Sequence, residues 1–217
     1  MNNIVMLESL GQEYNKSVYK KFKQIIDKYT LIEEGDCIAV EICLEKNALL
    51  LMNCMMKLQK EMKDAFGIKY FIVSDGKEVN NNVKNLLEQY QIHNVNIVPS
   101  SDKEQIYSKM KEVGCTKVAL PINYTNLVNT TFMTFMQKKE VAKMHPMSES
   151  KEMEGLSFIR PLCLIEEHVV LDWMSKMEIE VNEEESLFAR MALVEEGFVS
   201  KPNPGVARFH FAVYEGI

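Results

Sequence analysis

Residues 36–52 have the sequence DCIAVEICLEKNALLLM. The first part of this segment alternates in the manner of a buried strand, with apolar side chains at Ile38, Val40 and Ile42. The last part has apolar side chains at helical spacing, beginning with Leu49, Leu50 and Met52. A strand followed directly by a helix is the first unit of an open α/β sheet. The connection after the first strand faces the ligand crevice of such a sheet. Here that connection is 43–48, and it contains no glycine.

Strands and helices alternate on both sides of this unit. Ser17–Tyr29 is predicted to be an amphipathic helix with Ser17 as its N-cap. Further strands are predicted at 68–73, 95–98, 116–120 and 156–160. Helices are predicted at 46–66, around 79–90, and at 102–113, 125–138, 161–177 and 183–196, with Gly67 and Gly114 as helix stops. Because helices of this length connect strands by right-handed crossovers, we expect an α/β fold: an open, mostly parallel five-stranded sheet with helices on both faces, plus a C-terminal helix and strand.

Two segments fall outside this alternation. The polar stretch 145–155, HPMSESKEMEG, is predicted to be an excursion or mobile loop. Residues 206–214 alternate as an edge strand would, and we expect them to contribute to a homodimer. The predicted organisation is therefore an N-terminal extension at 1–16, an α/β domain at 17–177 and a C-terminal helix-strand extension at 178–217.

The composition excludes several classes of protein. With 217 residues, 47% of them hydrophobic, the chain suits one domain with a sizeable core, and it has neither a long apolar run nor a basic leader. We therefore expect a cytoplasmic protein with no membrane partner. Five scattered cysteines and four histidines lack the spacing of a disulfide frame or a metal site, so no metal ligand is predicted. The formal net charge of -6 disfavours a nucleic-acid partner unless a local basic patch overrides it.

Four short stretches resemble one family when they are taken in order. They are Leu31–Val40, Gly114–Leu120, Met144–Pro146 and Phe158–Leu162. Together they are similar to motifs of the PP-loop (N-type ATP pyrophosphatase) superfamily, and most closely to its tRNA 2-thiocytidine synthetase branch, over about residues 17–177. The resemblance implies a PP-loop ATPase, HUP-like fold. For an intact member it also implies ATP, magnesium and an iron-sulfur cluster as cofactors, with adenylation of a tRNA cytidine followed by attack of sulfur.

The phosphate-binding loop of that family is altered in this chain. Family members have Ser-Gly-Gly-Lys-Asp-Ser after the first strand, where glycines let backbone N–H groups approach the phosphates of ATP. The residues at these positions are Cys43, Leu44, Glu45, Lys46, Asn47 and Ala48, so only the lysine is retained. Glu45 adds a charge that repels a phosphate by roughly 1–4 kcal/mol at about 4 Å. We expect binding of ATP in the family manner to be strongly impaired.

The metal and cluster positions are altered as well. The family has Gly-His-His-x-x-Asp-Asp after the fourth strand, whereas this chain has 121–126, PINYTN, with no carboxylate or imidazole for magnesium. The branch's C-x-x-C corresponds to 95–100, VNIVPS, and Cys163 alone cannot hold an iron-sulfur cluster, so we expect it to be a core residue. No cofactor and no catalytic residue are therefore predicted. The predicted remnant of a nucleotide site consists of Cys43, Leu44, Glu45, Lys46, Asn47, Ala48, Ser74, Asn123 and Arg160, with Arg160 as an anion contact at the crevice rim.

Three functions are compatible with these features. The first is a catalytically degenerate PP-loop protein that binds a remodelled ligand, pairs with an active paralogue or acts as a regulatory subunit. The second is an active thiolating enzyme whose site is rebuilt from residues such as Glu41, Ser74 and Asp75. The third is a tRNA-binding protein without catalysis, which would use a lysine surface made of Lys20, Lys21, Lys23, Lys138, Lys139 and Lys143.

Overall fold

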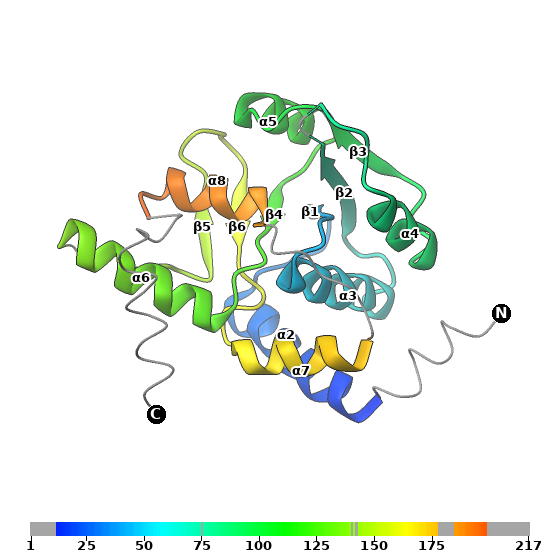
Figure 1. Ribbon diagram of the computed structural model, residues 1–217, viewed down its shortest axis with the longest axis horizontal. Coiled ribbons are helices and arrows are strands. Elements are labelled where there is room, and N and C mark those ends of the chain that lie inside the picture. Colours follow the sequence, from blue (N-terminus) through cyan, green and yellow to red (C-terminus); the bar gives the residue numbers. More distant parts are fainter. Residues whose placement is uncertain (1–11, 75, 140, 142, 178–184, 199–217) are drawn as a thin grey trace.

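The computed structural model describes residues 12–74, 76–139, 141, 143–177 and 185–198. Its centre is a six-stranded sheet with the strand order β3-β2-β1-β4-β6-β5 (Figure 1). The strands are β1 (Cys37–Glu41), β2 (Gly67–Val73), β3 (Val95–Val98), β4 (Lys117–Ala119), β5 (Met147–Glu149) and β6 (Ser157–Ile159). Neighbouring strands are parallel except for β5, which is antiparallel to β6. The expected open and mostly parallel α/β sheet is thus confirmed.

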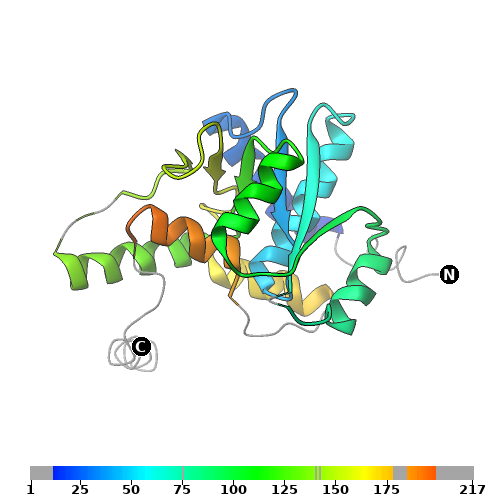
Figure 2. The ribbon, with the colours of Figure 1, turned by 90° about the horizontal axis from the view of Figure 1, so that it is seen from above.

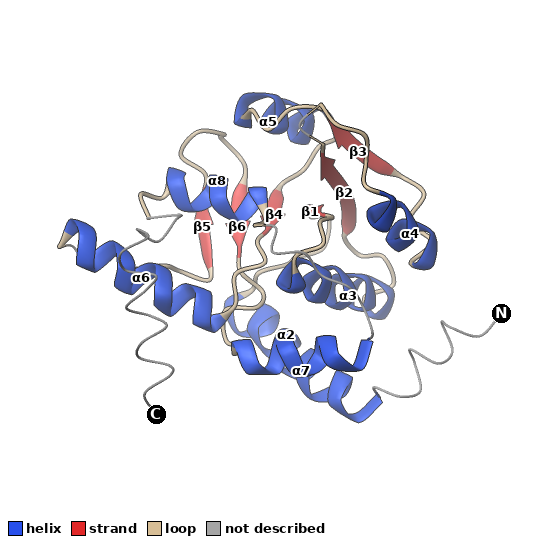
Figure 3. Cartoon of the chain, in the orientation of Figure 1, coloured by secondary structure: helices blue, strands red, loops and turns tan. Residues whose placement is uncertain are grey.

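Helices cover both faces of the sheet (Figure 3). They are α2 (Gln12–Tyr29), α3 (Lys46–Glu61), α4 (Asn81–Gln89), α5 (Lys103–Glu112), α6 (Tyr124–Lys138), α7 (Glu167–Met177) and α8 (Leu187–Glu195). Strand β1 divides the core: Ile38 and Val40 point into a cluster with α2, α3, α4 and α7, whereas Ala39 points into a cluster with α5 and α8. This alternation follows from the two-residue period of a strand.

All five predicted strands are present, and the sixth strand, β5, lies in the segment predicted to be a loop. Its three residues pair with β6, with Met147 opposite Ile159 and Glu149 opposite Ser157. Only Ser148 of the three is partly buried and the other two are exposed, so the sequence lacks the apolar alternation that would mark a strand. The prediction of a loop over all of 145–155 is wrong at these positions.

Several helix boundaries also differ from the prediction. Helix α2 begins at Gln12, so Ser17 lies inside it and is not its N-cap. Helix α3 ends at Glu61 because Lys63 and Asp64 adopt left-handed backbone conformations, and the Asp64 N–H then closes the turn on the Gln59 carbonyl. Gly67 therefore begins β2 and is not the helix stop. The predicted stop at Gly114 is confirmed, since this residue has a φ of +76° just after α5.

The C-terminal helix is shorter than predicted and packs on the sheet. Helix α8 begins at Leu187, where the Ser186 side chain accepts a hydrogen bond from the Ala189 N–H as its N-cap. The predicted strand at 206–214 and the dimer expected through it lie outside the described residues, as does most of the predicted extension at 1–16. None of the helices that the structure describes has the length and apolarity needed to cross a membrane.

Candidate functional site

The crevice of this sheet lies between the carboxyl ends of β1 and β4. These strands are parallel neighbours, with Val40 opposite Ala119, yet the chain moves away from β1 through α3 to β2 and reaches β4 only after α5. Such a point, where the strand order reverses, is where open α/β sheets bind ligands. The residues that follow β1 and β4 therefore form the candidate site, which we call the β1/β4 crevice.

Glu45 lies in this crevice at the N-terminus of α3. It is the N-cap of α3: its Oε2 accepts a hydrogen bond of 2.8 Å from the Ala48 N–H, and its Oε1 accepts one of 2.8 Å from Asn47 Nδ2. The N-terminus of a helix offers N–H groups and a partial positive charge, which is why phosphates bind there. Burial raises the pKa of Glu45, although the N–H donors and the Lys46 charge act in the opposite direction. The Glu45 carboxylate thus engages the Ala48 N–H, one of the donors that this end of the helix could offer to an anion.

The residues next to Glu45 are packing residues. Leu44 is buried in the cluster that α2, α3 and α7 form with the sheet, and Ala48 is buried at the start of α3. Cys43 is partly buried. In place of the flexible glycine pair of the family loop, this chain therefore has one side chain in the core and one that caps a helix.

Buried amides join the two sides of the crevice. Asn123, which is fully buried, caps α6 by accepting a hydrogen bond from the Asn126 N–H at 2.8 Å. Its Nδ2 donates to Asn47 Oδ1 at 3.0 Å and to Glu167 Oε2 at 2.6 Å. Asn47 Nδ2 in turn donates to Asn126 Oδ1 at 3.2 Å. We call Asn47, Asn123 and Asn126 the amide cluster; its hydrogen bonds fix the ends of β1 and β4 to each other and to α7.

Lys46 also lies at the crevice, but its charge is neutralised by α7. Its Nζ is 2.6 Å from Glu167 Oε1, and its side chain is one-third exposed. The same Glu167 carboxylate accepts from Asn123, so one acidic residue serves both the lysine and the amide cluster. A phosphate would have to compete with this carboxylate for Lys46.

Replacing Asn123 by alanine is expected to lower the free energy of unfolding by about 1–3 kcal/mol, because Asn47 and the first turn of α6 would lose buried partners. Urea denaturation of the two proteins measures this difference. The matched control is Asn82→Ala on the exposed surface of α4, for which we expect a change within about 0.5 kcal/mol. Equal effects of the two substitutions would contradict a stabilising role for the amide cluster.

Two other predicted site residues lie apart from the amide cluster. Ser74 follows β2, and its N–H donates to the Val98 carbonyl at 3.0 Å. Arg160 is fully buried at the end of β6, where its guanidinium donates to the His145 carbonyl at 2.9 Å and to Ser148 Oγ at 3.1 Å and pairs with Glu196. The prediction that Arg160 is an anion contact at the crevice rim is therefore wrong, because the carboxylate that it binds belongs to the end of the C-terminal helix. Asp75, considered for a rebuilt site, lies outside the described residues.

Glu41 has a structural role that sequence analysis missed. It is the last residue of β1 and is 6% exposed. Its carboxylate accepts hydrogen bonds from Ser186 Oγ at 2.6 Å, from the Phe188 N–H at 3.0 Å and from the Leu187 N–H at 3.1 Å. Burial raises the pKa of Glu41, while these donors act to lower it. A carboxylate at the end of an otherwise apolar strand was the available signal, but its partners are more than 140 positions away in the chain.

The contact with Glu41 places α8 against the crevice. Phe188 of α8 packs on Phe71 of β2, with ring centroids 5.8 Å apart. Helix α8 packs on the face of the sheet that includes Ala39 and Phe158, and it begins next to Glu41 at the carboxyl end of β1. The crevice is thus bordered by α7 and the amide cluster on one side of the sheet and by α8 on the other.

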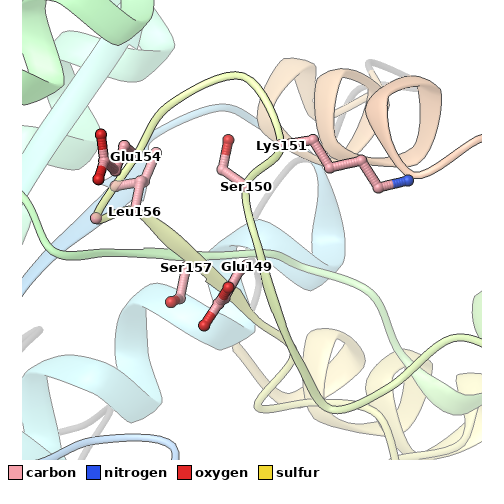
Figure 4. A pocket seen from close by; sticks show the side chains of 7 residues that line it. Glu149, Ser150, Lys151, Glu154, Leu156 and Ser157 are labelled. Carbon is pink, nitrogen blue, oxygen red and sulfur yellow. The ribbon is translucent and has the colours of Figure 1, made fainter.

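A separate pocket of about 520 Å³ lies at the turn between β5 and β6 (Figure 4). Glu149 and Ser157 lie next to each other in its wall, whereas Lys151 extends away from them. Ser157 pairs with Lys117, the first residue of β4, so this pocket is at the amino ends of the parallel strands. It therefore lies at the opposite end of the strands from the β1/β4 crevice.

Two further groups of candidate residues are the cysteines and the lysines. The five cysteines, all of which the structure describes, form no disulfide bond. Cys163 is a core residue, as predicted, with a pKa that burial raises to about 11. Within the described ranges, no three His, Cys, Asp or Glu side chains are grouped so that they could hold a metal ion.

Helix α2 and the carboxyl end of α6 lie in separate parts of the molecule, so the predicted lysine surface is divided (Figures 1 and 2).

The chain resembles a tRNA-modifying enzyme in sequence. It is 24% identical over 194 residues to a tRNA-cytidine(32) 2-sulfurtransferase of Acidovorax ebreus (strain TPSY), in an alignment that covers 77% of this chain. The alignment spans only 60% of that enzyme's length. A scan against protein-family models finds no match.

Solved structures share the fold. The U34-tRNA thiolase NcsA of Methanococcus maripaludis, solved with its [4Fe-4S] cluster, matches 94% of this chain and 80% of its own, with a TM-score of 0.63 and 14% identity. The FMN adenylyltransferase of Candida glabrata, solved with FMN and the ATP analogue AMPCPP, matches 80% of this chain and 65% of its own, with a TM-score of 0.53 and 9% identity. The comparisons point to the PP-loop superfamily and, within it, to a relationship with proteins of the tRNA-thiolation type.

Proposed function

We propose that this chain is a catalytically degenerate PP-loop protein with a non-enzymatic binding or regulatory role, related to the proteins that thiolate tRNA. The observation that carries the proposal is the Glu45 carboxylate on the N-terminus of α3. An anion that is covalently part of the loop occupies the helix N-terminus at a very high effective concentration, whereas ATP must bind from solution. It also repels the phosphates by its charge.

Two further features of the crevice support this proposal. Lys46, the one retained residue of the phosphate loop, is paired with Glu167. Asn123 and Asn126 follow β4 at the place where the family has acidic metal ligands. Their side-chain amides are already hydrogen-bonded to Asn47, and each side-chain oxygen also accepts from the backbone N–H of the other residue. Neutral amides that are already engaged are poor ligands for magnesium, which prefers carboxylates and water.

The role that remains for such a fold is recognition. A protein that retains the PP-loop architecture without its chemistry can pair with an active paralogue or control its access to tRNA. The hydrogen bonds of the amide cluster and of Glu41 connect the residues that follow β1 and β4 to α6, α7 and α8.

Calorimetric titration of the full chain with MgATP tests the proposal, with the Acidovorax sulfurtransferase as the positive control. We expect no heat of binding at micromolar concentrations and no release of AMP or pyrophosphate on incubation with tRNA. Micromolar binding that disappears in the Lys46→Ala variant would overturn the proposal. Loss of a tRNA thionucleoside in a strain that lacks this chain, restored by wild type but not by Lys46→Ala, would instead support an active enzyme with a rebuilt site.

A further inference from the structure

Helix α6 has an exposed apolar surface that nothing in the described residues covers. The side chains of this surface are each 41–45% exposed and are Tyr124, Val128, Phe132, Phe135 and Met136. Their spacing of four, four, three and one residues places them along one side of the helix, because a helix turns once every 3.6 residues. We call these five residues the α6 stripe.

The α6 stripe differs from ordinary scattered surface hydrophobics. Single exposed apolar residues are common on soluble proteins, but a contiguous row on one helix marks an interaction surface. Met133 and Thr134 of the same helix are buried, so α6 already has a side that packs against the protein. Figures 1 and 2 show the carboxyl end of α6 extending beyond the sheet. The α6 stripe therefore requires a second element to bury it.

The course of the chain brings such an element to the carboxyl end of α6. After α8, the Phe198 N–H donates to the Leu193 carbonyl at 2.7 Å, and the Gly197 carbonyl accepts a hydrogen bond from Lys138 Nζ in the last turn of α6. Residues 199–217 thus continue from a point held against α6. The contact of Phe198 with α8 and the contact of Gly197 with α6 fix the point from which this segment starts.

The sequence and length of this segment fit the α6 stripe. Residues 206–214 are VARFHFAVY, and in an extended chain Phe209, Phe211 and Val213 lie on one side. The seven residues 199–205 can span about 23–25 Å when extended, which matches the length of about 22 Å of the fifteen-residue α6. The apolar side of 206–214 can therefore reach any turn of the α6 stripe.

We propose that residues 206–214 dock on the α6 stripe of the same chain. Attachment through Gly197 gives the segment an effective concentration of about millimolar at α6, which favours it over a second copy at ordinary protein concentrations. The C-terminal segment then buries Phe132 and its neighbours and leaves Arg208 and His210 on the side that faces solvent. This proposal is independent of the nucleotide site and holds whether or not ATP binds.

Photocrosslinking in the full chain tests this docking. With p-benzoylphenylalanine in place of Phe132, irradiation is expected to produce a species of monomer mass in which α6 is joined to a peptide from 199–217. The matched control places the same residue at Leu171, which is 52% exposed on α7 and should form no crosslink with that peptide. Crosslinks in a species of dimer mass would assign the α6 stripe to a second copy and overturn the proposal, as would the absence of any crosslink to 199–217.

Two substitutions that introduce charges into the C-terminal segment provide a second test of the docking. In the same photoreactive protein, Phe209→Asp with Phe211→Asp should reduce the crosslink yield at least tenfold and increase the fluorescence of a dye that binds exposed apolar surface. Arg208→Asp with His210→Asp, on the other side of the segment, should leave both readouts within about twofold of the parent. Equal loss in both pairs would contradict docking through the apolar side.

Discussion

Replacing Glu196 by alanine is expected to lower the free energy of unfolding by about 3–5 kcal/mol, which is the usual effect of leaving a buried charge without its partner. The Arg160 guanidinium is fully buried, and the Glu196 carboxylate is the one anion that it contacts among the described residues. Ser148 Oγ, which also donates to Glu196, would lose the same acceptor. Urea denaturation followed by the fluorescence of Trp173, the single tryptophan of the chain and a core residue, measures the loss.

A paired substitution separates the buried charge from other effects. The double variant Arg160→Met with Glu196→Ala removes both charges, and we expect it to be more stable than Glu196→Ala alone. Glu112→Ala is the surface control: its carboxylate pairs with Lys109 on the solvent-facing side of α5, so the change should stay within about 1 kcal/mol. A loss for Glu196→Ala no larger than that of Glu112→Ala would contradict the assignment of a buried ion pair.

Arg160 also illustrates what a sequence leaves undetermined. Its position at the end of a predicted strand was correct, and the crevice rim was a reasonable place for it. The direction of its side chain depends on Glu196, which is 36 positions away and lies just beyond a helix whose packing partner the sequence does not reveal. Long-range pairing of this kind has no local signal, since the pattern of apolar residues describes only which side of an element is buried.

The fold was more predictable because its signals are local. Apolar runs such as Ile68–Val73 and the stop at Gly114 determine where strands and helices lie, and right-handed crossovers then restrict the order of the strands. The elements placed wrongly are those without such a signal. Strand β5 is short and largely exposed, and α3 ends where Lys63 and Asp64, neither of them the glycine that usually marks a helix stop, adopt a left-handed backbone conformation.

The candidate site was predictable from the sequence only in part. The sequence placed Glu45, Asn47 and Asn123 in one crevice, and the structure brings them together. The sequence indicates that Glu45 repels a phosphate, and the structure adds that the Glu45 carboxylate caps α3 through the Ala48 N–H. The residue types place Glu45 in the crevice, but they do not specify which N–H groups its carboxylate accepts hydrogen bonds from.

The contact between β1 and α8 provides the last prediction. Replacing Glu41 by alanine is expected to lower the free energy of unfolding by about 2–4 kcal/mol, because the first turn of α8 would lose an acceptor for Ser186 Oγ and for the N–H groups of Leu187 and Phe188. Amide hydrogen exchange of α8 should accelerate more than that of α3. Glu41→Gln retains one acceptor oxygen and should cost less, and Glu34→Ala, an exposed carboxylate ahead of β1, should have an effect within about 0.5 kcal/mol.

The same variant separates the two obstacles to a nucleotide in the crevice. Loss of the Glu41 contact loosens α8 on one side of the sheet but leaves Glu45 on the N-terminus of α3 and Glu167 on Lys46. We therefore expect Glu41→Ala to remain unable to bind MgATP in calorimetric titration. Micromolar binding by this variant alone would show that α8, and not the loop carboxylate, is what excludes the nucleotide, whereas exchange rates in α8 equal to those of wild type would remove the structural role assigned to Glu41.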